Sequence, residues 1–147
     1  MIFALTVGFA IVGVSCGAAY DTVFAKLLPN TANARSHTDG VAVFPNGNAV
    51  SVGYTYGLVG QESFGGSDFL LQMHTPAGSL VWTKVMGTSS TDLLSKVAVD
   101  SSFNVFAAGF TSGNFDGHSN AGILDCVVVK LDSLGNKLFS VQFGGSD

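Results

Sequence analysis

The sequence has few charged residues and almost no cysteine. Charged residues are 11% of the 147 residues, against about a quarter in typical soluble domains. The six basic residues are scattered and the net charge is −4, so neither a phosphate-binding surface nor a nucleic-acid partner is predicted. Of the two cysteines, Cys16 lies in the apolar start of the chain and Cys126 is then alone. No internal disulfide is expected.

Motifs that mark known reactions are also missing. The chain contains no G-x-S-x-G, Walker loop, H-E-x-x-H or repeated Asp-box, and no Asn-x-Ser/Thr sequon. His37, His74 and His118 lie in three different connections without a Cys or His at ligand spacing, so surface histidines are expected. We therefore predict a non-catalytic protein without a cofactor.

One long apolar stretch is present, at the N-terminus. Met1 to Val14 is almost wholly apolar, and small residues follow at Gly17 and Ala19. This pattern predicts a signal peptide over residues 1–19, and hence a secreted or cell-surface protein. Three alternatives remain open: a membrane anchor if residues 2–19 stay uncleaved, a lipid-linked cysteine, or a degenerate repeat strand.

The rest of the sequence repeats itself. VAVFPNGNAVSVGYT (Val41 to Thr55) recurs as VAVDSSFNVFAAGFT (Val97 to Thr111), an offset of 56 residues. Further along the chain the offset is 57, because Asp68 recurs as Asp125. Repeats of this length that consist of short strands are typical of propeller blades.

Each unit is expected to form four strands. Apolar runs are short and are punctuated by Gly, Asn, Ser and Pro, which argues against helix anywhere after residue 20. Asn46-Gly47 supplies the positive φ of a tight hairpin turn. The strands expected in the first unit are Gly40–Phe44, Ala49–Thr55, Asp68–Met73 and Leu80–Met86. Those expected in the second unit are Lys96–Val99, Val105–Thr111, Asp125–Leu131 and Lys137–Phe143.

The expected fold class is therefore all-β, with four-stranded antiparallel meanders as β-propeller blades. The segment Thr22–Leu28 adds an N-terminal strand, since it matches the fourth strand LVWTKVM. Shifted by one residue, DTVFAKL matches the third strand DCVVVKL instead. The predicted divisions are 20–36 for this strand and its linker, 37–92 for the first repeat and 93–147 for the second. Propellers have about four to eight blades, so we expect a fragment of a larger propeller or an assembly of copies. An open edge and an apolar blade face would favour self-association.

The second unit resembles the SBBP family of β-propeller repeats. The resemblance rests on VAVDSSFNVFAAGFT, on the Asp before VVVKLDSLGN and on FSVQFGGSD, and it extends over about residues 22 to 147. The first unit departs from the pattern at Phe44 and at QMHTPAG. The resemblance implies an exported propeller built from repeats, and it supplies no catalytic residues.

Loop length distinguishes the two ends of each predicted blade. Connections alternate between the ends of a meander, so the long ones lie together at one end: Tyr56–Ser67, Gly87–Ser95 and Ser112–Leu124. Scaffolded loops can vary without disturbing a core, so a protein or carbohydrate ligand is expected to bind at this end. Two alternatives remain open: part of a propeller hydrolase or lyase whose active site lies in other blades, and a calcium-dependent adhesion module.

The calcium alternative depends on one loop. Asn114, Asp116, His118 and Asn120 alternate in a Gly-rich stretch, and oxygen atoms at such positions can converge on calcium. A plain network of Asx turns around Asp116-Gly117 accounts for the same residues.

Two pairs of repeated residues are predicted to be structural. Asp68 and Asp125 are expected to accept backbone N–H bonds where the long loops end. Gly53 and Gly109 are expected where a side chain would obstruct a neighbouring strand or blade.

One aromatic position and one cysteine complete the structural predictions. Trp82 recurs as Phe139 in the predicted fourth strands, and we expect both to be structural. Cys126 takes the position of Phe69, which predicts a buried core thiol.

Overall fold

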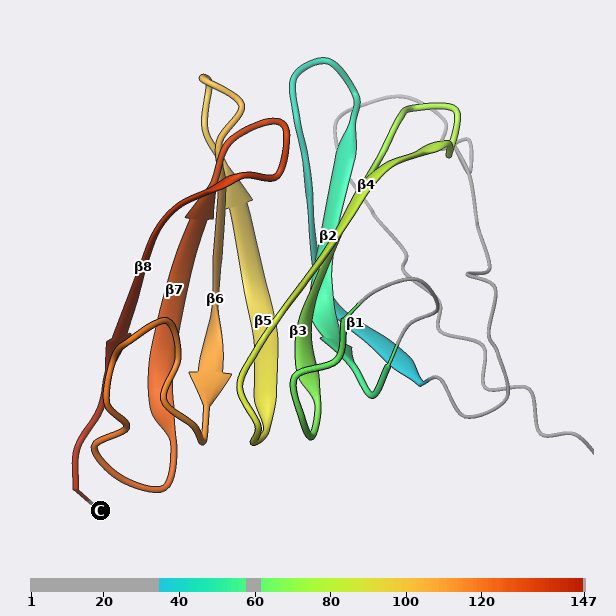
Figure 1. The fold of residues 1–147 in the computed structure, drawn as a ribbon. Helices are drawn as coiled ribbons and strands as arrows, with labels where there is room; N and C mark the ends of the chain where they lie inside the picture. Colours follow the sequence, from blue (N-terminus) through green and yellow to red (C-terminus); the bar gives the residue numbers. More distant parts are fainter. Residues whose placement is uncertain (1–34, 58–61, 147) are drawn as a thin grey trace, which may run out of the picture.

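The structure is a computed structural model that describes residues 35–57 and 62–146. These residues form eight strands and no helix (Figure 1). The first sheet contains β1 (Ser36–Val43), β2 (Ala49–Thr55), β3 (Asp68–His74) and β4 (Leu80–Met86). The second contains β5 (Asp92–Val99), β6 (Val105–Thr111), β7 (Asp125–Leu131) and β8 (Lys137–Phe143). Both sheets are antiparallel and follow chain order, so the all-β prediction with four-stranded meanders is confirmed.

Two predicted N-terminal features concern residues that the structure does not describe. The predicted signal peptide, residues 1–19, and the predicted strand Thr22–Leu28 lie outside the described residues. Within the described ranges, the structure contains no helix with the length and apolar character needed to cross a membrane. The two sheets do not close into a ring.

The first strand of each sheet begins earlier than predicted. β1 begins at Ser36 rather than Gly40, and β5 begins at Asp92 rather than Lys96. The cause is a β-bulge in each strand, which inserts an extra residue and interrupts the alternation that marks a strand in a sequence. The repeated glycine of the adjacent strand lies opposite each bulge.

That glycine lies in close contact with backbone. A Cβ built on Gly53 would lie 1.9 Å from the carbonyl oxygen of His37, and one on Gly109 would lie 1.8 Å from that of Leu93. The obstructed neighbour is therefore the bulged strand of the same sheet.

The hairpin turns at one end of the sheets share one geometry. In the β1–β2 turn, the N–H of Gly47 donates to the carbonyl of Phe44, and Gly47 has a φ of 83°. Gly78 and Gly135 occupy the same position in their turns. Phe103 does so in the β5–β6 turn with a φ of 63°, although it is not a glycine. Its ring stacks on Phe44 at 5.6 Å between centroids.

Acid is expected to weaken the β5–β6 turn. The carboxylate of Asp100 accepts bonds from the side chain of Asn104 at 2.7 Å and from the N–H groups of Ser102 and Asn104. The Asn104 side chain contributes most to lowering the pKa of Asp100 below its usual value of 3.8. A lowered pKa in the folded state stabilises the protein at pH values above the usual pKa of 3.8. This stability is lost as the pH falls through the folded-state pKa.

Carbon-13 NMR titration of the carboxyl groups measures this effect. Asn104→Ala should raise the pKa of Asp100, whereas Asn136→Ala, the matched change in the β7–β8 turn, should raise that of Asp132. An unchanged pKa of Asp100 in Asn104→Ala would show that the turn network is wrong.

The core lies between the two sheets. β5 lies against β1, β2 and β3, and the buried cluster joins residues such as Val52 and Leu71 of the first sheet to Leu94 and Val129 of the second. At the hairpin-turn end, the indole N–H of Trp82 donates to the carbonyl of Ser133 at 3.1 Å. The second sheet therefore covers one face of the first.

The predicted burial of Cys126 is wrong, because this thiol is exposed. Its counterpart Phe69 is completely buried, since it lies on the covered face of the first sheet. Cys126 lies on the corresponding face of the second sheet, which no described residues cover in the same way. Trp82 and Phe139 differ for the same reason: the first is half-buried and the second is exposed.

Candidate functional site

The β2–β3 loop, the β4–β5 connection and the β6–β7 loop lie together at one end of the two sheets and are joined by backbone hydrogen bonds. The β4–β5 connection is residues 87–91 and not the predicted long loop Gly87–Ser95, because β5 begins at Asp92. The N–H of Gly66 donates to the carbonyl of Ser90 at 3.1 Å, and the N–H of Asp92 donates to that of Ser67 at 2.8 Å. The N–H of Ser112 donates to the carbonyl of Thr91 at 2.9 Å. The β2–β3 loop is thus tied to the β4–β5 connection, and that connection is tied to the β6–β7 loop. We call this surface the long-loop end.

The β6–β7 loop is held down by residues that the sequence did not indicate. Phe115 is buried, and its ring meets Phe69 edge to face at 5.1 Å between centroids. Gln142 accepts the N–H of Phe115 at 2.8 Å and donates to the carbonyl of Gly113 and to Asp125. The first repeat has Val85 where the second has Gln142, so comparison of the repeats gave no signal for this role.

All four predicted calcium ligands contact other groups of the protein. Asn114 accepts the N–H of Asn120 at 2.8 Å, and Asn120 accepts that of Gly122 at 2.8 Å. Asp116 pairs with Lys137 and accepts the hydroxyl of Ser140. His118 Nε2 lies 3.3 Å from the carbonyl oxygen of Ser140. Of these contacts only the bond from Gly122 to Asn120 is an Asx turn, and Asp116 binds residues of β8 instead of its own turn.

The charge of this loop is balanced by one lysine. The bond from Lys137 contributes most to lowering the pKa of Asp116. Within the described ranges there is no group of three or more His, Cys, Asp or Glu side chains placed to hold a metal ion. Calcium binding at this loop stays a prediction.

The three predicted surface histidines differ in exposure. His37 is exposed, and its ring stacks on Tyr54 at 5.3 Å between centroids. His118 is half-buried, and His74 is buried at the end of β3. The prediction is therefore wrong for His74, because both faces of β3 are covered along its whole length.

Asp68 and Asp125 begin β3 and β7 and are both buried. Asp68 accepts the N–H of Phe64 and the hydroxyl of Ser63, each at 3.1 Å. Asp125 accepts the N–H of Ala121 at 2.9 Å. Each carboxyl group thus binds backbone where a long loop meets a strand. In each, the Oδ1 atom has no hydrogen-bond partner among the described residues.

A third buried carboxylate, Asp92, was not predicted. It begins β5 and accepts the N–H of Thr88 at 2.6 Å, the Thr88 hydroxyl, and the hydroxyl of Thr111. At the matching position of the first repeat, Ser36 donates to the hydroxyl of Thr55 at 3.1 Å. The threonine recurs but the carboxylate does not, so the repeat pattern did not reveal Asp92.

The long-loop end also exposes apolar side chains. The exposed apolar residues at this end are Tyr56, Phe64, Ile123 and Leu124. Ile123 is 75% exposed. Exposed apolar groups on a scaffolded loop are typical of a surface that binds a partner.

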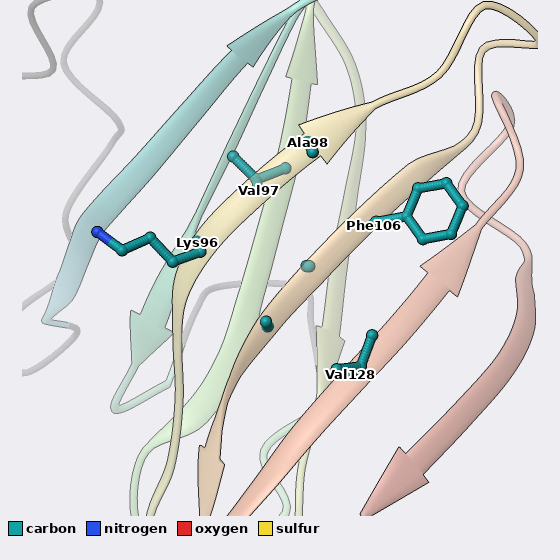
Figure 2. Close-up of a pocket in the computed structure, with 7 residues that line it drawn as sticks. Lys96, Val97, Ala98, Phe106 and Val128 are labelled. Carbon is teal, nitrogen blue, oxygen red and sulfur yellow. The ribbon is translucent and has the colours of Figure 1, made fainter.

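A second candidate surface lies on the face of the second sheet that points away from the first. A hollow of about 210 Å³ crosses β5, β6 and β7 there (Figure 2). It is lined by Lys96, Val97, Ala98, Phe106, Ala107, Ala108 and Val128. The lining is almost entirely apolar, so this surface has the character of a packing face and not of a catalytic cleft.

Comparison with known proteins shows no family for this chain. Neither a scan of protein-family models nor a search of curated proteins gives a match. The resemblance to SBBP repeats stays a prediction.

Proposed function

We propose that this chain is a structural and binding module of an exported protein of the β-propeller type, and not an enzyme. In this proposal its four-stranded repeats stack face to face, as in SBBP-like propellers, and the long-loop end binds a protein or carbohydrate partner. One observation carries the proposal: the exposed face of the second sheet corresponds to the covered face of the first.

This correspondence follows from the repeat. Leu71 is completely buried beneath the second sheet, and Trp82 bonds to a turn of that sheet. An offset of 57 residues leads from these positions to Val128 and Phe139. Both lie on the outer face of the second sheet, where Phe139 is 44% exposed. The arrangement of the first two sheets, applied once more, would place a third sheet there.

The composition of the outer face supports this interpretation. Besides Phe139, it exposes Val141 and Phe143 of β8. Phe106 and Val128 line its hollow (Figure 2). A contiguous apolar face of this kind marks an interaction surface.

The first sheet indicates which kind of sheet fits the outer face. The face of the second sheet that packs on the first contains Val129 and Leu131, both completely buried. The first sheet has Gln72 and His74 at these positions. A following repeat like the second therefore matches the outer face better than the first sheet of another copy does.

An extended chain tests the stacking. A further copy of residues 93–147 would be added after Asp147, with Cys16 of the chain and the cysteine of the added copy replaced by serine. Cys126 then reports on the outer face, since its counterpart Phe69 is completely covered by a neighbouring sheet. The third unit should slow the reaction of Cys126 with a thiol reagent several-fold and raise the free energy of unfolding.

The control is the same extended chain with Val129→Lys in the added copy, which places a charge on the packing face of that copy. Cys126 should then react as it does in the 147-residue chain. Unchanged reactivity of Cys126 beside a correctly folded third unit would refute the stacking proposal.

A further inference from the structure

Two buried carboxyl groups face the same space where the first sheet meets the second. Asp68 begins β3, Asp92 begins β5, and both are completely buried. A Cβ built on Gly87 would lie 2.5 Å from Oδ1 of Asp68 and 2.8 Å from Oδ2 of Asp92. The two oxygens therefore converge beside Gly87, where a larger residue would have no room.

The two carboxyl groups differ in their hydrogen bonds. Thr88 and Thr111 donate to both oxygens of Asp92. Asp68 accepts bonds at Oδ2 only, and its Oδ1 has no partner within the described ranges. If Asp68 were ionised, Oδ1 would be an unpaired buried charge beside a second carboxylate, which is strongly unfavourable.

We propose that Asp68 keeps a proton at pH values at which exposed aspartates have lost theirs, and donates it in a hydrogen bond to Asp92. The pair then joins β3 of the first sheet to β5 of the second. Loss of the proton places two negative charges across this junction and weakens it as the pH rises. The junction is thus a pH-sensitive contact between the sheets.

The surroundings of Asp68 favour the protonated form. Burial raises the pKa of Asp68 most, and the charge of Asp92 raises it further, while the bonds from Phe64 and Ser63 oppose this. Of the elements around it, β5 contributes the charged Asp92, and β2 contributes the uncharged Thr55, which pairs with Asp68 in the sheet. Among the described residues, Asp92 is the charged group that acts on Asp68.

Part of this geometry recurs in the second sheet. Oδ1 of Asp125 is also buried without a hydrogen-bond partner among the described residues. A Cβ built on Gly144 would meet that atom at 1.9 Å. The aspartate and the glycine thus belong to the repeat, whereas the second carboxylate, Asp92, comes from the neighbouring sheet.

The test compares thermal unfolding of the wild-type chain and Asp68→Asn between about pH 3 and 8. A raised folded-state pKa makes the wild type lose stability as the pH rises from 3.8 through that pKa. Asp68→Asn lacks this titration. The melting temperature of the variant, measured relative to that of the wild type, should therefore rise as the pH rises across this range. Asp100→Asn serves as the control, because the stability that Asp100 contributes is present above pH 3.8 and is lost as the pH falls through its lowered pKa.

Carbon-13 NMR titration of the Asp68 carboxyl group in the wild-type chain decides the matter even if a variant fails to fold. We expect a pKa above the ordinary value that falls in Asp92→Asn. Ionisation of Asp68 at or below the ordinary value would overturn the proposal. So would a rise in melting temperature with calcium that is present in the wild type and lost in Asp68→Asn, because a cation and not a proton would then occupy the pair.

Discussion

Gly109→Ala is expected to lower the free energy of unfolding by about 3 kcal/mol or more, the upper part of the range for overpacked sites. The added Cβ would lie 1.8 Å from the carbonyl oxygen of Leu93 and 2.7 Å from Cα of Leu94. Both are backbone atoms of β5, so no rotation of a side chain can relieve the collision. Displacing β5 would disturb the core as well, because the Leu94 side chain is completely buried between the sheets.

Denaturant unfolding followed by circular dichroism measures this loss. Gly145→Ala is the control, because no atom lies within 4 Å of a Cβ built there and the backbone has an ordinary φ. Gly53→Ala should behave like Gly109→Ala, since its Cβ would lie 1.9 Å from the carbonyl oxygen of His37. Equal stability of the Gly109 and Gly145 variants would show that the close approach of β5 and β6 is wrong.

Phe69→Ala is expected to cost about 3 to 5 kcal/mol of the free energy of unfolding, as for other large-to-small changes at buried aromatics. The Phe69 ring is completely buried between the sheets and meets Phe115 edge to face. Its removal leaves a cavity at the interface of the sheets. It also removes the contact that holds the β6–β7 loop against the first sheet.

The matched control is Phe139→Ala on the outer face of the second sheet. Phe139 is 44% exposed, so its truncation should cost about 1 kcal/mol or less, as is usual near a protein surface. The comparison uses denaturant unfolding at low protein concentration, so that self-association does not cover Phe139. Similar losses in the two variants would mean that the outer face is covered in the isolated chain.

The strand boundaries show which parts of the fold could be predicted from the sequence. β2 and β6 begin and end where they were predicted, because a turn precedes each and a Gly-aromatic-Thr phrase closes each. β1 and β5 were predicted too short. Their bulges break the alternation of side chains, and a pattern that depends on alternation cannot continue through a bulge.

The long-loop end shows which functional-site contacts could not be predicted from the sequence. Asp68 and Asp125 were indicated because they recur at strand starts, and both hold loop backbone. Asp92 and Gln142 make comparable contacts, yet the first repeat has a serine and a valine at their positions. A residue that has its role in just one of the two repeats cannot be identified by comparing the repeats.

Burial depended on packing that no local pattern specifies. Phe69 and Cys126 occupy equivalent positions in strands of the same register, but one is covered by a neighbouring sheet and the other is exposed. The sequence therefore determined the two antiparallel meanders, their turns and the glycines that lie opposite the bulges, because these depend on interactions within one repeat. Only the tertiary structure decided which faces are covered and which carboxyl groups meet, because the contacts between sheets join residues far apart in the chain.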